Sequence, residues 1–213
     1  TVSVTIAEPT AITASDVISN VTCNGLSDGG VNLTVSGGTV ASNYTFAWDN
    51  SATTEDITGL LAGNYVVTIT DNNGCFDTAS VTITEPIALI AGITLDSNAS
   101  CFGTSTGGAT AFANGGVGPY FYNWNHGPTA ASLNTLAAGT YTVVILDQNG
   151  CLDTTDITIS EPTLITSTAV QVSAVNCFNG NDGSATVSPI GGTMPYSYAW
   201  GNGETADTAT NLS

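Results

Sequence analysis

Three kinds of side chain in this sequence are equipped for chemistry: five cysteines, a single histidine and a set of 17 acidic residues. The cysteines are Cys23, Cys75, Cys101, Cys151 and Cys177. Cysteines form disulfides or bind zinc, and carboxylates are the natural ligands of calcium. Which chemistry applies depends on the elements that bring these side chains together.

The charge of the chain limits its partners. The sequence has no Lys and no Arg, and its formal net charge is −17. Binding to nucleic acid or to anionic lipid needs cationic side chains, so we expect neither partner. Hydrophobic residues make up 42% of the chain, which is enough to form cores and argues against disorder. No apolar run reaches the ~18 residues of a membrane helix, so we expect no membrane insertion.

An internal repeat of about 76 residues organises the sequence. Trp48, Trp124 and Trp200 are each 76 residues apart. Three other markers recur with nearly the same period. Glu-Pro pairs lie at Glu8-Pro9, Glu85-Pro86 and Glu161-Pro162. A first cysteine recurs at Cys23, Cys101 and Cys177, and a second cysteine at Cys75 and Cys151. Several unrelated markers with one period indicate tandem domains.

The repeat sets the expected domain boundaries. Repeat 1 covers residues 10–86, repeat 2 covers 87–162, and repeat 3 covers 163–213 and is incomplete. Residues 1–9 match the end of a repeat and are expected to be the last strand of a preceding one. The chain has no initiator Met, so we expect it to be part of a longer protein that extends in both directions.

Alternating side chains predict strands. Tyr44, Phe46 and Trp48 are separated by small residues, and a period of two places all three on one face. Other segments alternate apolar and hydroxyl residues in the same way. We therefore predict an all-β protein of tandem Ig-like β-sandwich domains, each with about seven short strands. The short Glu-Pro linkers predict a rod-like array.

The turns carry recognisable signals. Asp71–Gly74 and Asp147–Gly150 contain Asn-Gly or Gln-Asn-Gly and predict hairpins with two-residue turns. A Gly-Gly pair, first seen at 37–38, marks a bend before each aromatic strand. Leu60–Tyr65 and Leu136–Tyr141 resemble a tyrosine corner, in which the Tyr hydroxyl bonds to the upstream backbone.

The repeat also suggests how the cysteines pair. We predict one disulfide inside each complete repeat, Cys23–Cys75 and Cys101–Cys151, with the partner of Cys177 beyond Ser213. Two cysteines per repeat and no matching His are too few ligands for zinc. One difficulty stands against this pairing, because the usual Ig wiring places the two segments at opposite ends of the domain.

Calcium is the one cofactor that the sequence suggests. The candidate ligands are Asp28, Asp71, Asp147 and Asp182, which lie in Asn- and Asp-rich loops. Thr106 replaces the aspartate in repeat 2, so a site there cannot be obligatory, and Asp71 is also suited to cap its own turn. The unrepeated His126 has no nucleophile–base partner, so we expect no enzyme activity and no catalytic residue.

The ordered motifs identify a family resemblance. Each repeat reads Cys-x4-Asp/Thr-Gly, Gly-Gly, an aromatic strand ending in Trp, Leu-x-Ala-Gly-x-Tyr, Asp-x-Asn-Gly-Cys and Glu-Pro, as far as the sequence extends. This series resembles the SprB-type repeat of gliding and surface adhesins in Bacteroidota. The resemblance implies a giant extracellular cell-surface protein, exported by type IX secretion. Asp-Thr motifs at Thr78, Thr154 and Thr208 also resemble the O-glycosylation motif of that phylum.

Three functions follow from these observations. The first is an adhesin stalk, whose repeats contact only their neighbours and carry a tip away from the cell. The second is a self-assembling filament or sheath, in which other copies are the partners and strand edges without Lys pair between chains. The third is direct binding of a ligand, such as a host or surface glycan, by exposed aromatic residues.

Overall fold

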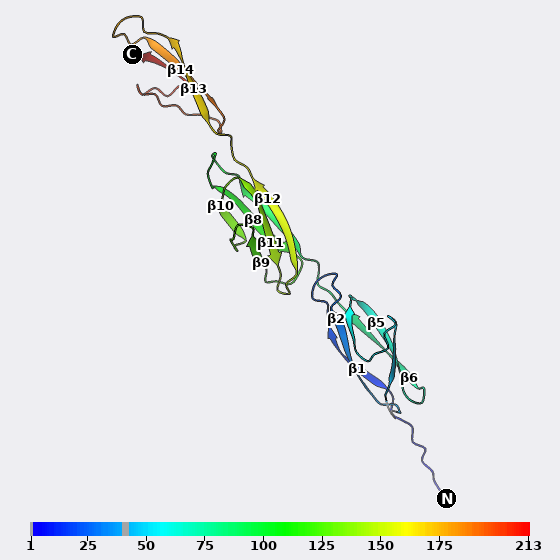
Figure 1. Cartoon of the computed structure of the whole chain (residues 1–213). Helices are drawn as coiled ribbons and strands as arrows, with labels where there is room; N and C mark the ends of the chain where they lie inside the picture. Colours follow the sequence, from blue (N-terminus) through cyan, green and yellow to red (C-terminus); the bar gives the residue numbers. More distant parts are fainter. Residues whose placement is uncertain (1, 40–42) are drawn as a thin grey trace. The chain divides into compact units, whose positions relative to one another are not determined.

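The computed structural model describes residues 2–39 and 43–213 (Figure 1). In this part of the chain all regular secondary structure is β-strand, and no helix is long and apolar enough to cross a membrane. The chain forms two compact units: Thr1–Ala91, Ala113–Phe121 and Val144–Thr154 make the first, and Gly92–Phe112, Tyr122–Val143 and Thr155–Ser213 the second. Repeat 1 lies wholly in the first unit, and repeat 3 wholly in the second.

Repeat 1 contains two three-stranded antiparallel sheets. Its strands are β1 (Thr13–Ser19), β2 (Gly29–Ser36), β3 (Thr45–Trp48), β4 (Ile57–Leu60), β5 (Gly63–Thr70) and β6 (Phe76–Ile83). One sheet has the order β1-β2-β4 and the other β3-β5-β6. Six strands are described in this repeat, one fewer than predicted, and they form the Ig-like β-sandwich expected from the alternation.

Repeat 2 has the same wiring. Its strands are β7 (Ile90–Ser97), β8 (Gly107–Asn114), β9 (Phe121–Trp124), β10 (Ser132–Leu136), β11 (Gly139–Leu146) and β12 (Leu152–Ile159). They form sheets of order β10-β8-β7 and β12-β11-β9. The predicted all-β fold of tandem sandwiches is therefore confirmed.

Repeat 3 contains one sheet among its described residues. Its strands are β13 (Thr166–Ser173), β14 (Gly183–Ile190) and β15 (Thr208–Leu212), in the order β13-β14-β15. They correspond to β1, β2 and β4. The aromatic segment 196–200, which corresponds to β3, is not in a strand. Residues 2–9, expected to be the last strand of a preceding repeat, form no strand, and Thr1 lies outside the described residues.

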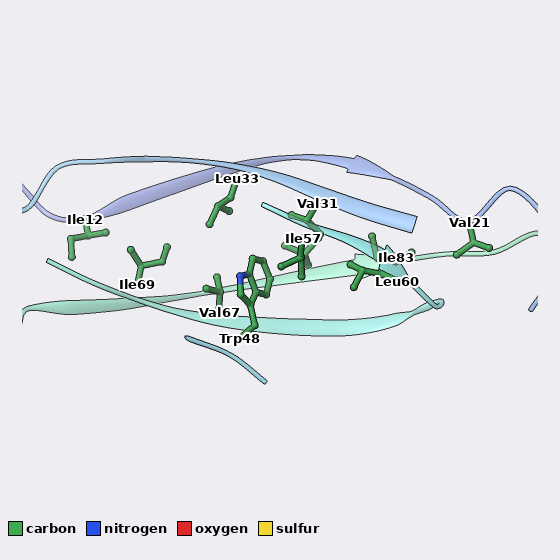
Figure 2. Packing of buried hydrophobic residues seen from close by; sticks show 11 residues of the cluster. Ile12, Val21, Val31, Leu33, Trp48, Ile57, Leu60, Val67, Ile69 and Ile83 are labelled. Atoms are coloured by element: carbon green, nitrogen blue, oxygen red, sulfur yellow. The ribbon is translucent and has the colours of Figure 1, made fainter. Parts of the chain in front are cut away.

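The core of repeat 1 lies between its two sheets (Figure 2). Val31 and Leu33 of β2 face Val67 and Ile69 of β5, with the Trp48 ring between the layers. Trp48 is buried, and its indole Nε1 donates to the carbonyl of Thr54 at 2.9 Å. Tyr44 and Phe46 pack against the same cluster, so the aromatic alternation points inward as predicted.

The Gly-Gly bends are required by the backbone. Gly37 has a φ of +87°, and a Cβ there would lie 1.9 Å from the carbonyl oxygen of Ala11. The Gly37 carbonyl then accepts a hydrogen bond from the Tyr44 hydroxyl at 2.6 Å. The same bond joins Tyr120 to Gly115 and Tyr196 to Gly191. The bend thus sets the start of the aromatic segment in all three repeats.

The tyrosine corners are confirmed, whereas the predicted two-residue turns are wrong. The Tyr65 hydroxyl donates to the Leu61 carbonyl and that of Tyr141 to the Ala137 carbonyl, both at 3.0 Å. In the β5–β6 hairpin only Gly74 has a positive φ (+82°), whereas a two-residue Asn-Gly turn needs two such residues. The Asp71 N–H donates instead to the Cys75 carbonyl across a three-residue loop.

Candidate functional site: the repeat junction

The first cysteine of repeat 1 lies in the loop between β1 and β2, beside the end of β6. The Val21 N–H donates to the Thr84 carbonyl at 3.0 Å, and the Thr84 N–H donates to Asn20 Oδ1 at 2.9 Å. Cys75 lies immediately before β6, at the opposite end of that strand. Because a strand rises about 3.3 Å per residue, the eight residues of β6 separate the two cysteines by about 26 Å.

The predicted pairing within each repeat is therefore wrong. A disulfide needs Cα atoms less than about 7 Å apart, which Cys23 and Cys75 cannot satisfy. The structure instead bonds Cys23 of repeat 1 to Cys151 of repeat 2, across 128 residues of sequence and with a Cα–Cα distance of 5.6 Å. Within the described residues Cys75, Cys101 and Cys177 are free and exposed. The wiring difficulty noted in the sequence is resolved by bonding to the next repeat.

Polar contacts accompany this disulfide, and all of them lie inside the first compact unit. Asn149 Nδ2, in the β11–β12 hairpin, donates to the Thr22 carbonyl at 2.8 Å. Asn24 Nδ2 donates to the Pro86 carbonyl at 3.1 Å, and the Gly25 N–H donates to Glu85 Oε2 at 2.6 Å. The Glu-Pro linker is thus held by the loop that carries Cys23.

The loop that carries Cys101 repeats these contacts without a disulfide. The Gly103 N–H donates to Glu161 Oε2 at 2.6 Å, and the Ala99 N–H donates to the Ser160 carbonyl at 2.9 Å. Gly25 and Gly103 both have positive φ, +77° and +72°. The loop conformation is therefore set by local hydrogen bonds in both repeats.

Two of the calcium candidates, Asp28 and Asp182, stabilise the loop that carries the first cysteine of their own repeat. Asp28 Oδ1 accepts the Thr22 N–H at 3.1 Å, and its Oδ2 accepts the Thr22 hydroxyl. In repeat 2 Thr106 Oγ1 accepts the equivalent Ser100 N–H at 2.8 Å. In repeat 3 Asp182 accepts the Asn176 N–H at 3.0 Å. A hydroxyl can replace the carboxylate because each residue accepts a backbone N–H.

The other two candidates hold the hairpins. Asp71 is buried, and Oδ1 accepts the N–H groups of Asn73 and Cys75 at 2.9 Å while Oδ2 accepts that of Thr39 at 2.8 Å. The Thr39 N–H and the hairpin N–H groups lower the pKa of Asp71 from its usual value. Asp147 accepts the equivalent N–H groups of Asn149 and Cys151.

Hydrogen bonds also lower the pKa of the loop aspartates. The Thr22 hydroxyl is the main cause at Asp28, and the Asn176 N–H is the main cause at Asp182. The structure does not bring these carboxylates together: the described part of the chain holds no group of three or more His, Cys, Asp or Glu placed to bind a metal. Calcium binding stays a hypothesis drawn from the sequence.

The remaining predicted positions are dispersed. His126 is exposed in a turn, and its ring lies edge-on to Tyr141 with centroids 4.8 Å apart. Thr78 on β6 and Thr154 on β12 are exposed, whereas Thr208 on β15 is half-buried and its hydroxyl donates to that of Thr186 at 3.1 Å. Glycosylation of these threonines stays a prediction.

Sequence reasoning missed the junction residues that come from the linker and the neighbouring hairpin. Glu85, Pro86 and Asn149 contact the Cys23 loop through the bonds above. Their signal was present, because the Asn-Gly-Cys and Glu-Pro motifs recur with the same period as the first cysteine. The sequence does not say which copy of a motif meets which.

The fold and junction define a class of tandem β-sandwich repeats that are joined covalently. The SprB repeat family model matches three stretches, 15–53, 97–129 and 169–205, one within each of the three repeats. These stretches together cover just over half of the chain. The chain belongs to the SprB repeat family.

Comparison with individual proteins adds remote similarities of fold. No curated protein sequence matches the chain. Among solved structures, fibronectin(III)-like modules of Clostridium thermocellum CbhA match with 15% identity and a TM-score of 0.29, over 71% of this chain and 95% of theirs. Sidekick-1 immunoglobulin domains 1–5 match with 12% identity and a TM-score of 0.38, over 87% of this chain and 46% of theirs.

Proposed function

We propose that these repeats form the spacer region of a large adhesin on a bacterial cell surface, used in attachment or gliding. The observation that carries this proposal is the Cys23–Cys151 bond, which ties one SprB repeat to the next. A spacer must transmit force between its ends without coming apart. A covalent bond across the junction provides that continuity in addition to the linker.

An extracellular location suits both the disulfide and the surface charge. Disulfides persist in oxidising compartments, and a net charge of −17 keeps a crowded surface protein soluble. The family's cell-surface character supports the same location. Labelling of intact cells with an antibody to these repeats tests it: a signal without permeabilisation is expected, and a signal only after permeabilisation contradicts it.

The spacer is expected to be a structural protein and not an enzyme. His126 is exposed in a turn and is the one histidine of the sequence. The recurring aspartates are used to bind backbone N–H groups. Glycan binding by the aromatic strand of repeat 1 is disfavoured, because Trp48 belongs to the core cluster and Tyr44 and Phe46 pack against it.

Pulling a single chain tests the spacer role. With the disulfide intact, the 128 residues that it spans cannot extend, which hides about 420–460 Å of contour length. We expect the non-reduced chain to extend less than the Cys151→Ser variant by this amount. Equal extension of the two proteins would show that the junction carries no covalent load.

A self-assembling filament is the second candidate, favoured by exposed edge strands. β1 lies at the edge of its sheet with all seven residues exposed, including Val17 at 69%. Charged residues, Lys above all, commonly block pairing at such edges, and the chain has no Lys. Electron microscopy of the purified chain separates the candidates: single molecules support the spacer, and ordered fibres support the filament.

A further inference from the structure

The three free thiols each lie in a copy of one half of the Cys23–Cys151 junction. We call the β1–β2 loop and its equivalents, with Cys23, Cys101 and Cys177, the loop halves. The hairpins that end in Cys75 and Cys151 are the hairpin halves. The observed disulfide joins the loop half of repeat 1 to the hairpin half of repeat 2.

The loop halves have one conformation whether or not the sulfur is bonded. The carbonyl of the cysteine accepts the N–H three residues on, from Leu26 to Cys23 at 3.1 Å and from Gly180 to Cys177 at 2.9 Å. The residue two positions after the cysteine has a positive φ in each case, +77° at Gly25 and +58° at Asn179. Cys177 is thus presented in the same turn as the bonded Cys23.

The hairpin halves are equally alike. The N–H of Cys75 donates to Asp71 Oδ1 and that of Cys151 to Asp147 Oδ1, both at 2.9 Å. Cys75, Phe76 and Ile12 line a recess of about 420 Å³. Their equivalents Cys151, Leu152 and Leu89 line the recess of the bonded junction together with Cys23. The hairpin half of repeat 1 therefore presents a cysteine and apolar side chains like those of the hairpin half that bonds Cys23, beside residues 8–10 of its own chain.

Exposure distinguishes the two free loop halves. Cys101 and Phe102 share a recess of about 300 Å³ with Leu164 and Ile165 of repeat 3, so this loop is partly covered by its own chain. Phe178, next to Cys177, is 96% exposed, and Phe76, next to Cys75, is 70% exposed. The most open loop half is that of Cys177, and it carries an exposed ring to match the exposed ring beside Cys75.

We propose that the loop half and the hairpin half are complementary faces, and that a second copy of this chain docks its Cys75 hairpin on the Cys177 loop and forms a disulfide there. The two thiols lose two protons and two electrons to a small-molecule disulfide such as oxidised glutathione, which is reduced to two thiols through a mixed disulfide. In an array of these repeats, the same loop-to-hairpin pairing bonds each repeat through its loop half to one neighbour and through its hairpin half to another. The proposal does not depend on the spacer role.

Two variants isolate the faces in the full chain. One carries Cys101→Ser and Cys177→Ser and keeps the hairpin thiol; the other carries Cys75→Ser and Cys101→Ser and keeps the loop thiol. Both keep Cys23 and Cys151. Equal amounts, one of them labelled with ¹⁵N, are oxidised with glutathione disulfide at about 0.15 M salt, where long-range repulsion is screened. Intact mass then counts heterodimers and homodimers.

Specific docking predicts at least about a tenfold excess of heterodimer over the two homodimers together, equivalent to about 1.4 kcal/mol. Peptide mapping should place the bond between Cys75 and Cys177. Random thiol pairing gives as many heterodimers as homodimers and overturns the proposal, as does a bond through Cys23 or Cys151.

Surface variants that keep the thiols provide the matched control. Phe76→Asp in the hairpin protein and Phe178→Asp in the loop protein replace exposed rings, so both chains should keep the circular dichroism of the parent. Docking through these faces predicts that the heterodimer excess falls to the random ratio. An undiminished excess would overturn the assignment of the faces.

Discussion

The Cys23 loop of repeat 1 and the Cys101 loop of repeat 2 have the same backbone bonds, yet only one of them carries a disulfide. Each loop donates a glycine N–H to the glutamate of the following Glu-Pro linker at 2.6 Å. Cys23 is bonded to Cys151, and Cys101 is free. The comparison teaches that the disulfide does not shape the loop and acts between repeats.

The largest expected difference between the loops comes from removing their sulfurs. Cys23→Ser should lower the free energy of unfolding by about 2–4 kcal/mol under non-reducing conditions, because the unfolded chain loses a constraint. Cys101→Ser, at an exposed free thiol, should change it by no more than about 0.5 kcal/mol. Thermal melts of the two variants and the parent measure this difference.

Reductant is the control for this pair. Once the disulfide is reduced, the parent and Cys23→Ser should melt together. A loss of stability in Cys101→Ser equal to that in Cys23→Ser would contradict the free state of Cys101 and would break the comparison.

The linker glutamates should matter equally in the two repeats. Glu85→Ala and Glu161→Ala each remove a charged acceptor of a glycine N–H, and we expect each to cost about 1 kcal/mol. Melts in the presence of reductant isolate this local effect from the disulfide. If Glu85→Ala lowers the free energy of unfolding and Glu161→Ala leaves it unchanged, the two loops are not held by the same bonds.

The acid response should distinguish Asp28 from Thr106. The Thr22 hydroxyl lowers the pKa of Asp28, so its stabilising bonds are fully present above the unfolded value of about 3.9 and are lost as the pH falls through the folded value. Asp28→Thr copies repeat 2 and keeps an acceptor for the Thr22 N–H. We expect a small loss of melting temperature at pH 7, which begins to shrink as the pH falls below about 4 and is gone once the pH lies below the lowered pKa of folded Asp28.

Asp28→Ala supplies the comparison for that variant. It leaves the Thr22 N–H without its acceptor, so it should melt below Asp28→Thr at pH 7. Equal melting of the two variants would show that the hydroxyl at Thr106 is no substitute for a carboxylate.

Chelation should have the smallest effect. The candidate carboxylates accept backbone N–H groups in the structure, so we expect EDTA to leave the melting temperature of the chain unchanged. A fall on chelation that is reversed by added calcium would contradict this expectation and support the calcium hypothesis. Asp28→Thr, which copies the Thr106 loop of repeat 2, would then test whether the Asp28 loop holds the ion.

Period-two alternation predicted most of the strands of repeats 1 and 2 and the inward aromatic face, and the Leu-x-Ala-Gly-x-Tyr motif predicted the tyrosine corners. Alternation failed at residues 2–9 and 196–200, which form no strand. It placed Trp48 in the core because side chains on a strand alternate between faces. The hairpin turn was mispredicted, since the Asp71 side chain binds the N–H groups of a three-residue loop. Such competition between a side chain and the backbone is not visible in the Asn-Gly signal.

The disulfide partners could not be deduced from the sequence, because a repeat gives equivalent positions without saying which copy bonds to which. Pairing inside one repeat satisfied the cysteine count. It failed on length, since β6 separates the two cysteines, and the linker brings the next repeat's hairpin to the Cys23 loop. The positions that the strands and the linker give to the cysteines in space decide which of them pair.

Peptide mapping of the non-reduced chain, after free thiols are blocked, tests the junction most directly. Trypsin cannot be used on a chain without Lys or Arg, so pepsin at low pH is suitable and also suppresses disulfide exchange. The structure predicts one linked peptide pair that joins Cys23 to Cys151, with blocked thiols at Cys75, Cys101 and Cys177. Peptides that join Cys23 to Cys75 and Cys101 to Cys151 would contradict it.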